Sequence, residues 1–290
     1  RILQNQNMDT VKISAADVKK LRDQTGAGMM DCKKALTEAE GDYEKAIEIL
    51  RKKGQKLSAK RAERDAKEGV VIALTSHNRN NGVIIRLSCE TDFVAKTDSF
   101  VELAKQVAEV ALKTLPDSLE SLLELPFEGE LSIGAKITEQ VGVIGEKIEV
   151  NRYEKIETAA GEGQVLPYIH MGYRAGVIVA LNLEGPQFME PGKNVAMQIA
   201  AMRPIAVDKD GVDATTVEKE IEIGKEQARQ AGKPEAMLEK IAMGKLNKFY
   251  KENTLLNQQY VKDSSMSISK YLQSIDGKLT VTDFKHVELG

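Results

Sequence analysis

The sequence predicts an α+β fold: an N-terminal helical module, then two related subdomains that each contain a small antiparallel sheet and helices. Residues 70–74 (VVIAL) and 83–87 (VIIRL) are apolar runs on either side of a turn-forming stretch, which is typical of a β-hairpin. Residues 177–181 (VIVAL) repeat the second run, and a helical pattern follows both. Aromatic residues make up 4% and Trp is absent, so aliphatic side chains must fill the cores. That composition favours helices and small sheets over a β-sandwich.

Residues 13–55 are predicted to form a compact three-helix module, after a tail of residues 1–12 that has no clear periodicity. Ser14 and Asp42 suit the N-caps of the first and third helices, and Gly54 is expected to end the third. A bundle of about 40 residues is only marginally stable alone, so we expect a docking module that gains stability from what it contacts. The apolar positions of its predicted core are Val18, Leu21, Met29, Leu36, Tyr43, Ala46, Ile47 and Leu50.

A basic segment follows the module. Residues 51–67 contain eight Lys and Arg against two acids, and we interpret residues 56–68 as a solvated helical linker. These basic residues are not interleaved with aromatic side chains that would stack on bases, so the expected partner is an acidic protein surface. The alternative is a non-catalytic, RNA-associated adaptor that uses this segment. The lysines it would use are Lys52, Lys53, Lys56 and Lys60.

The first core subdomain is assigned to residues 69–155, with residues 146–153 as a third strand. The second is assigned to residues 156–212 and 254–290, and its strands are expected at residues 164–171, 177–181 and 279–288. Both repeats are expected to run as hairpin, loop and helix.

The connection after the central strand differs between the two copies. The first copy has residues 91–94 (TDFV) there, whereas the second has residues 184–188 (EGPQF). We therefore expect only the first loop to be specialised. Its apolar side chains are costly to expose, so Phe93 is either a core residue or an anchor for a partner.

Residues 213–253 predict a helical hairpin, because two helical segments are interrupted at Gly232, Lys233 and Pro234. Its seam is expected to contain Ile221, Ala228, Met237, Ile241 and Leu246. The hairpin either packs on its own body or supports a homodimer, and the sequence leaves both open.

The sequence has no recognisable catalytic or metal-binding constellation. There is no GxxxxGK[ST] phosphate loop, no GxGxxG after a strand, and no HExxH or CxxC pair. The three histidines His77, His170 and His286 are dispersed, and Cys32 and Cys89 lack metal-ligand or disulfide spacing. We therefore expect no enzyme, no cofactor and no metal, but a protein that acts on another protein.

The charge and hydropathy patterns bear on the compartment. The net charge is -3, and no apolar run approaches the ~20 residues that span a bilayer. The start of the sequence lacks the basic-then-apolar form of a secretion signal. We expect a cytoplasmic protein with free thiols and no membrane partner.

Two stretches resemble the signatures of a known family. Residues 89–96 (CETDFVAK) are similar to the second signature of elongation factor Ts, the guanine nucleotide exchange factor of translation. Residues 21–36 (LRDQTGAGMMDCKKAL) are similar to its first signature. Two long motifs in the expected order argue against chance similarity. The likeness is dense over residues 15–100, looser over 165–250, and weak at both ends.

The resemblance implies a guanine nucleotide exchange factor that binds elongation factor Tu with GDP and promotes GDP release during translation elongation. Thr91, Asp92, Phe93 and Val94 would disturb the magnesium and phosphate site of that GTPase. In this family Phe93 would insert between helices of the nucleotide domain, and Asp92 would help displace groups around the magnesium ion. No nucleic acid is required for this activity.

The resemblance also carries over contacts outside the loop. The three-helix module corresponds to a UBA-like module that binds the same nucleotide domain, which points to Met29, Met30 and Lys33. His170 and Val261 correspond to weaker contacts in the second subdomain. Core packing remains the alternative for both Met residues, and a hydrogen-bonded sheet histidine remains the alternative for His170.

Three departures from the family pattern limit the comparison. Arg86 stands where the family usually has an acid, on the strand before the loop, and leaves the loop interpretation intact. Lys262 replaces the second member of an apolar pair, which puts the contact at Val261 in question. Many relatives continue into a C-terminal helical module, whereas this sequence stops at Gly290. We therefore expect binding to depend more on the first signature and the loop.

Overall fold

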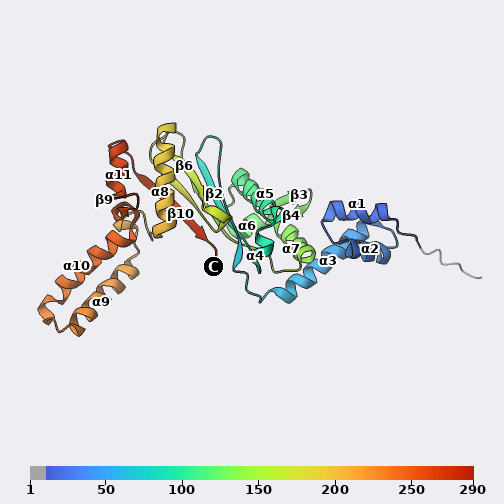
Figure 1. Cartoon of the computed structure of the whole chain (residues 1–290), viewed down its shortest axis with the longest axis horizontal. Helices are drawn as coiled ribbons and strands as arrows, with labels where there is room; N and C mark the ends of the chain where they lie inside the picture. The colour runs from blue at the N-terminus through green and yellow to red at the C-terminus, as the bar shows by residue number, and fades with distance from the viewer. Residues whose placement is uncertain (1–10) are drawn as a thin grey trace, which may run out of the picture.

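The computed structural model describes residues 11–290, and it has an elongated shape. A helical module lies at one end, a helical hairpin projects at the other, and two sheets lie between them (Figure 1). The predicted tail, residues 1–12, lies outside the described residues except for Val11 and Lys12.

Two three-stranded antiparallel sheets form the centre of the molecule, and they share one topology. In each sheet a hairpin supplies an edge strand and the central strand, and a later strand pairs with the other side of the central strand. The predicted pair of related subdomains is therefore confirmed. The first sheet has the order β1 (Glu68–Thr75), β2 (Asn81–Cys89) and β5 (Glu149–Glu157), and the second has β10 (Val281–Glu288), β7 (Ala175–Leu181) and β6 (Gln164–Ile169).

The central strands read as continuous apolar runs because both of their faces are buried. Along β7, Val177 and Val179 point to an outer core, whereas Ile178 packs between the two sheets. Ile84 on β2 lies in the same inter-sheet core. Helix α5 (Asp98–Thr114) covers the outer face of the first sheet and α8 (Met189–Met202) covers that of the second. The resulting order is helix, sheet, sheet, helix (Figure 1).

Arg86 connects the two sheets. Its Nε donates to Asn151 Oδ1 at 2.8 Å, and its Nη1 donates to the carbonyl oxygen of Glu288 at 2.8 Å. Arg86, which stands where the family usually has an acid, therefore helps to attach β10 to the first subdomain.

The N-terminal module consists of α1 (Ala15–Thr25), α2 (Met29–Glu38) and α3 (Tyr43–Arg61). Both predicted N-caps are confirmed: Ser14 forms a capping box with Asp17, and Asp42 accepts from the backbone of Lys45. The assignment of Met29 to the core is wrong, because its side chain is 55% exposed. Ala27, just before α2, and Cys32 on α2 are the buried residues in this part of the module.

The prediction that Gly54 ends the third helix is also wrong, because α3 continues to Arg61 and includes part of the predicted linker. Gly54 lies where α3 packs on α7 (Ile133–Ile144). A Cβ atom at this glycine would lie 2.7 Å from the carbonyl oxygen of Thr138. The glycine thus permits a close helix crossing instead of a helix end.

The helical hairpin is confirmed as α9 (Ala214–Gln230) and α10 (Glu235–Asn253). Its buried seam contains Ala228 and Leu246 as predicted, but Leu238 takes the place expected for Met237, which is exposed. Ala242 is likewise buried next to the predicted Ile241, and both Ile221 and Ile241 are half-buried. Self-association through the hairpin stays a prediction.

Shorter elements complete the two subdomains. Those of the first are α4 (Asp92–Ala95), α6 (Leu119–Glu124), β3 (Pro126–Glu128) and β4 (Leu131–Ser132). Those of the second are η1 (Met171–Tyr173), η2 (Pro186–Phe188), η3 (Lys209–Gly211), η4 (Leu255–Asn257), β8 (Gln259–Tyr260), β9 (Asp263–Ser267) and α11 (Ile268–Ile275).

Candidate functional site

The TDFV stretch forms a single helical turn directly after the central strand β2. Thr91 is the N-cap of α4, and its hydroxyl accepts from the backbone N–H of Val94 at 3.4 Å. Val94 packs against the core of the first subdomain, whereas Phe93 is 81% exposed. Of the two interpretations of Phe93, the core residue is wrong. The turn presents a large apolar side chain to solvent.

Asp92 lies beside Phe93 as an ionised carboxylate. Lys96, one helical turn later, donates to Asp92 Oδ2 at 2.7 Å. This hydrogen bond and the ammonium charge lower the pKa of Asp92 below its ordinary value. The exposed end of the turn therefore combines a negative charge with an aromatic ring.

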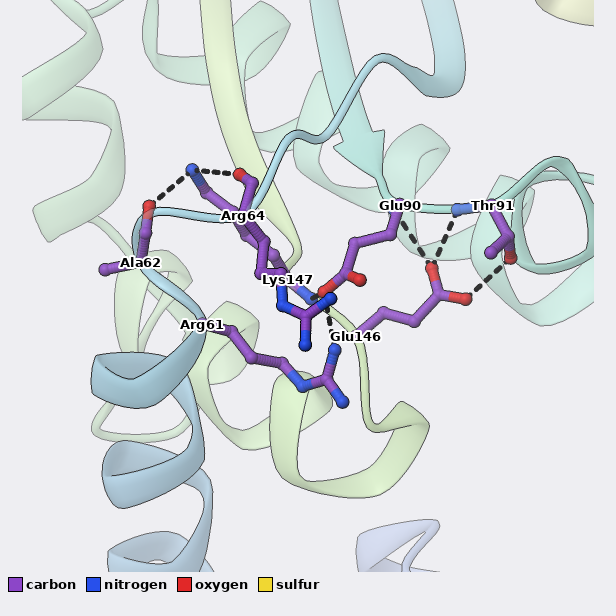
Figure 2. A network of polar contacts seen from close by, with 7 residues as sticks. All are labelled: Arg61, Ala62, Arg64, Glu90, Thr91, Glu146 and Lys147. Carbon is purple, nitrogen blue, oxygen red and sulfur yellow. Dashed lines mark hydrogen bonds and ion pairs between the residues drawn. The ribbon is translucent and has the colours of Figure 1, made fainter.

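The base of the turn is fixed by the carboxylate of Glu146, which follows α7 (Figure 2). Its Oε2 accepts from the backbone N–H groups of Glu90 and Thr91, both at 3.0 Å. Its Oε1 accepts from the Thr91 hydroxyl at 2.6 Å. Sequence reasoning missed Glu146, because no local spacing links residue 146 to the turn.

Glu90 connects the same region to the end of α3 (Figure 2). Its Oε1 accepts from Arg61 Nη1 at 2.8 Å and from the backbone N–H of Lys147 at 2.7 Å. Partial burial acts to raise the pKa of Glu90, but these hydrogen bonds and the charges of Arg61 and Arg64 outweigh it. The net result is a lowered pKa, so Glu90 stays ionised.

The candidate contacts of the N-terminal module share one surface of α2. Met29 is 55% exposed, Met30 is 66% exposed, and Lys33 is exposed as well. Because residues three and four apart are neighbours on a helix, both Met side chains flank Lys33. Core packing is therefore the wrong interpretation for both Met residues. The structure does not bring this surface next to the TDFV turn, which lies in the first core subdomain (Figure 1).

His170 and Val261 come together at one cavity of about 650 Å³, although they are far apart in sequence. His170 lies just past β6 and is exposed, and its Nδ1 lies 3.1 Å from the Tyr168 hydroxyl. Val261 is exposed on the loop between β8 and β9. The alternative of a hydrogen-bonded sheet histidine is right about the hydrogen bond, which Tyr168 supplies, and wrong about the sheet, because β6 ends at Ile169.

A second groove, of about 570 Å³, lies between the TDFV turn and η1. Asp92 and Lys96 line it on one side and Tyr173 on the other, and Arg174 lines both this groove and the cavity at His170. Met171 in η1 is 88% exposed, and the sequence analysis missed it. A surface with two hollows therefore extends from the turn to His170.

Metal ligands, cysteine thiols and membrane-spanning helices define other kinds of site, and residues 11–290 can be compared with each. Across this range no group of three or more His, Cys, Asp or Glu side chains is placed to bind a metal ion. Cys32 and Cys89 are free and buried, and burial raises the pKa of Cys89 to about 12, so its thiol stays protonated. None of the described helices combines the length and apolar composition needed to cross a membrane.

Comparison with known proteins gives a consistent result. The family model "Elongation factor TS" matches residues 90–290. The chain is 51% identical to elongation factor Ts of Christiangramia forsetii over 279 residues, covering 96% of this chain and 99% of that protein. It is 52% identical to elongation factor Ts of Amoebophilus asiaticus over 279 residues, with the same coverage. It is 46% identical to elongation factor Ts of Clostridium botulinum over 286 residues, which cover 96% of this chain and 92% of that protein.

The stacked sheets, the exposed turn and this nearly full-length similarity define the class: a factor of translation elongation. Within that class the chain belongs to the elongation factor Ts family.

Proposed function

We propose that this protein is a guanine nucleotide exchange factor that binds elongation factor Tu with GDP and accelerates GDP release. Membership in the elongation factor Ts family supports an exchange role in general. The observation that carries the mechanism is the 81% exposure of Phe93 beside the ionised Asp92, on a turn with a fixed base.

A GTPase binds its nucleotide through a magnesium ion and through backbone amides around the phosphates. Insertion of Phe93 between helices of the nucleotide domain would bury an apolar side chain, which supplies about 1.5–3 kcal/mol. That energy offsets part of the lost magnesium coordination. Once its ion pair with Lys96 opens, Asp92 brings a negative charge toward the phosphates and so disfavours the bound nucleotide. By linkage, the nucleotide must weaken binding of this protein by the same factor.

The remaining surfaces would provide affinity. Met29, Met30 and Lys33 would contact the nucleotide domain, since Met side chains adapt to a partner's shape and Lys33 can pair with an acidic group. His170 and Val261 would contact another part of elongation factor Tu from the second subdomain. None of these contacts needs a bond-breaking step, so the protein acts as a non-enzymatic exchange factor, and we place it in the cytoplasm with its partner.

The RNA-associated alternative gains no support from the basic segment. Five of its eight basic side chains form ion pairs with acids, which offset their charge. Lys53, for example, lies 2.6 Å from Asp31, and Lys52 lies 2.8 Å from Glu48.

The proposal is tested by the release of fluorescent GDP from elongation factor Tu of the same source, with catalytic amounts of this protein. We expect acceleration by the wild type and a large loss with Asp92→Ala and with Phe93→Ala. No acceleration by the wild type would reject the exchange function. RNA binding that weakens with salt and is lost when Lys52, Lys53, Lys56 and Lys60 are neutralised would then favour the alternative.

A further inference from the structure

The base of the TDFV turn is hydrogen-bonded to a side chain that lies 55 residues further along the chain. We propose that Glu146 is a positioning residue, which sets the direction in which Phe93 leaves the surface and thereby the rate of nucleotide exchange. This inference rests on the proposed exchange function and identifies how its site is organised.

The Glu146 carboxylate accepts three hydrogen bonds at the base of the turn. The N–H groups of Glu90 and Thr91 lie between the end of β2 and the start of α4, and Glu146 accepts from both. The Thr91 hydroxyl donates to the same carboxylate and also accepts from Val94 N–H. Glu146 therefore fixes both the backbone at the entry to the turn and the rotamer of its N-cap, because hydrogen bonds to a charged group are short and strong.

The backbone on both sides of Glu146 is held in place. It follows Gly145, whose φ of 82° ends α7 in the left-handed conformation. The next residue, Lys147, donates from its backbone to Glu90 and from its Nζ to the carbonyl oxygens of Ala62 and Arg64, at 2.8 and 3.1 Å (Figure 2). The segment that carries Glu146 is thus attached on one side to the turn and on the other to the end of α3.

The turn itself does little to orient Phe93. α4 is one turn long, and Phe93 is 81% exposed, so the ring has little packing of its own to orient it. Val94 and Ala95 anchor the end of the turn in the core, and Glu146 anchors its beginning. Without the Glu146 bonds, the Phe93 side chain would still be present, but it could point away from the protein surface in several directions.

The test compares Glu146→Ala, Glu146→Gln and Glu149→Ala with the wild type in GDP release from elongation factor Tu, over a range of concentrations. Glu149 is the matched control, because its carboxylate lies 3.8 Å from Nζ of the same Lys147 but accepts a hydrogen bond from Asn151 on its own strand instead of from the turn. We expect Glu146→Ala to lower the maximal rate by about tenfold, with less than about a threefold change in the half-saturating concentration. Glu146→Gln should lower the maximal rate by about threefold or less, because its amide oxygen can still accept from the two backbone N–H groups, whereas its NH2 group cannot accept from the Thr91 hydroxyl.

A double mutant separates positioning from general damage. In a protein that already carries Phe93→Ala, adding Glu146→Ala should lower the maximal rate of GDP release by less than about twofold, since Glu146 acts through Phe93. Additive losses, an equal loss with Glu149→Ala, or no loss with Glu146→Ala would each overturn the proposal. If Glu146→Ala does not fold, Glu146→Asp replaces it, because the shorter side chain keeps the charge but withdraws the carboxylate from Thr91.

Amide hydrogen exchange on the free protein keeps this proposal distinct from the exchange function. Glu146→Ala should increase exchange at residues 90–94, and Glu149→Ala should not. If the wild type fails to release GDP, the proposed function is rejected, whereas unchanged amide exchange in Glu146→Ala rejects the positioning role.

Discussion

Gly54 of α3 and Gly142 of α7 pack so closely that a Cβ atom on Gly142 would lie 2.8 Å from the Cα atom of Gly54. This contact attaches the N-terminal module to the first core subdomain through backbone atoms. At the end of α3, Arg61 donates to Glu90 at the base of the TDFV turn. Just beyond it, the carbonyl oxygen of Ala62 accepts from Lys147, which follows Glu146. The two proposed partner-binding surfaces therefore belong to one connected framework.

The first prediction concerns this helix crossing. Gly142→Ala should lower the free energy of unfolding by about 1–3 kcal/mol, because the added methyl group meets backbone that cannot move aside cheaply. Gly244→Ala in α10 is the control, since a Cβ atom there has nothing within 4 Å. It should raise the free energy of unfolding by about 0.5–1 kcal/mol through helix propensity. Denaturant unfolding measures the change in the free energy of unfolding for each variant. A change of the same sign in both variants would contradict the proposed role of the crossing.

The second prediction separates activity from stability at Phe93. Because the side chain is 81% exposed, Phe93→Ala should change the free energy of unfolding by less than about 0.5 kcal/mol. GDP release should nevertheless slow, with a modest loss of affinity for elongation factor Tu. Ile275→Ala, at another exposed apolar side chain, serves as the control and should leave release unchanged. An unchanged release rate with Phe93→Ala would exclude the wedge mechanism.

The third prediction assigns affinity to one surface of α2. Lys33→Ala, or Met29→Ala with Met30→Ala, should weaken binding to elongation factor Tu by about 1–2 kcal/mol. The maximal exchange rate at saturation should change little, because these side chains lie away from the turn. Lys34→Ala is the matched control, since Lys34 is an exposed neighbour outside the proposed contact. Calorimetric titration checks the prediction, and equal losses at Lys33 and Lys34 would show a general charge effect.

The fourth prediction follows from the lowered pKa of Glu90. A carboxylate whose pKa is lower in the folded protein stabilises it above the pKa of the unfolded chain, and this contribution is lost as the pH falls through the folded value. The stability difference between wild type and Glu90→Gln should therefore be constant from about pH 7 to about pH 5 and shrink at lower pH. Denaturant unfolding at several pH values measures it. A difference that declines already above about pH 6 would indicate a raised pKa instead.

The sequence by itself determined the elements that depend on local patterns. Short apolar runs predicted the strands of the two hairpins. The side chains of Ser14 and Asp42 predicted helix starts, because N-cap side chains bond within three residues. The two signatures also identified the TDFV stretch. These features could be predicted because they depend on residues that are close together in the sequence.

The tertiary structure decided which of those residues face solvent and what supports them. Phe93 and Met29 are apolar residues that the sequence pattern alone could assign to a core, whereas in the structure both are exposed and their neighbours Val94 and Ala27 pack inward. The sequence predicted a helix end at Gly54, whereas in the structure α3 continues past this residue and α7 packs directly against it. The bonds from Glu146 to the turn join parts of the chain that only the folded sheet and helices bring together. Long-range packing has no local signal, which is why it had to be observed.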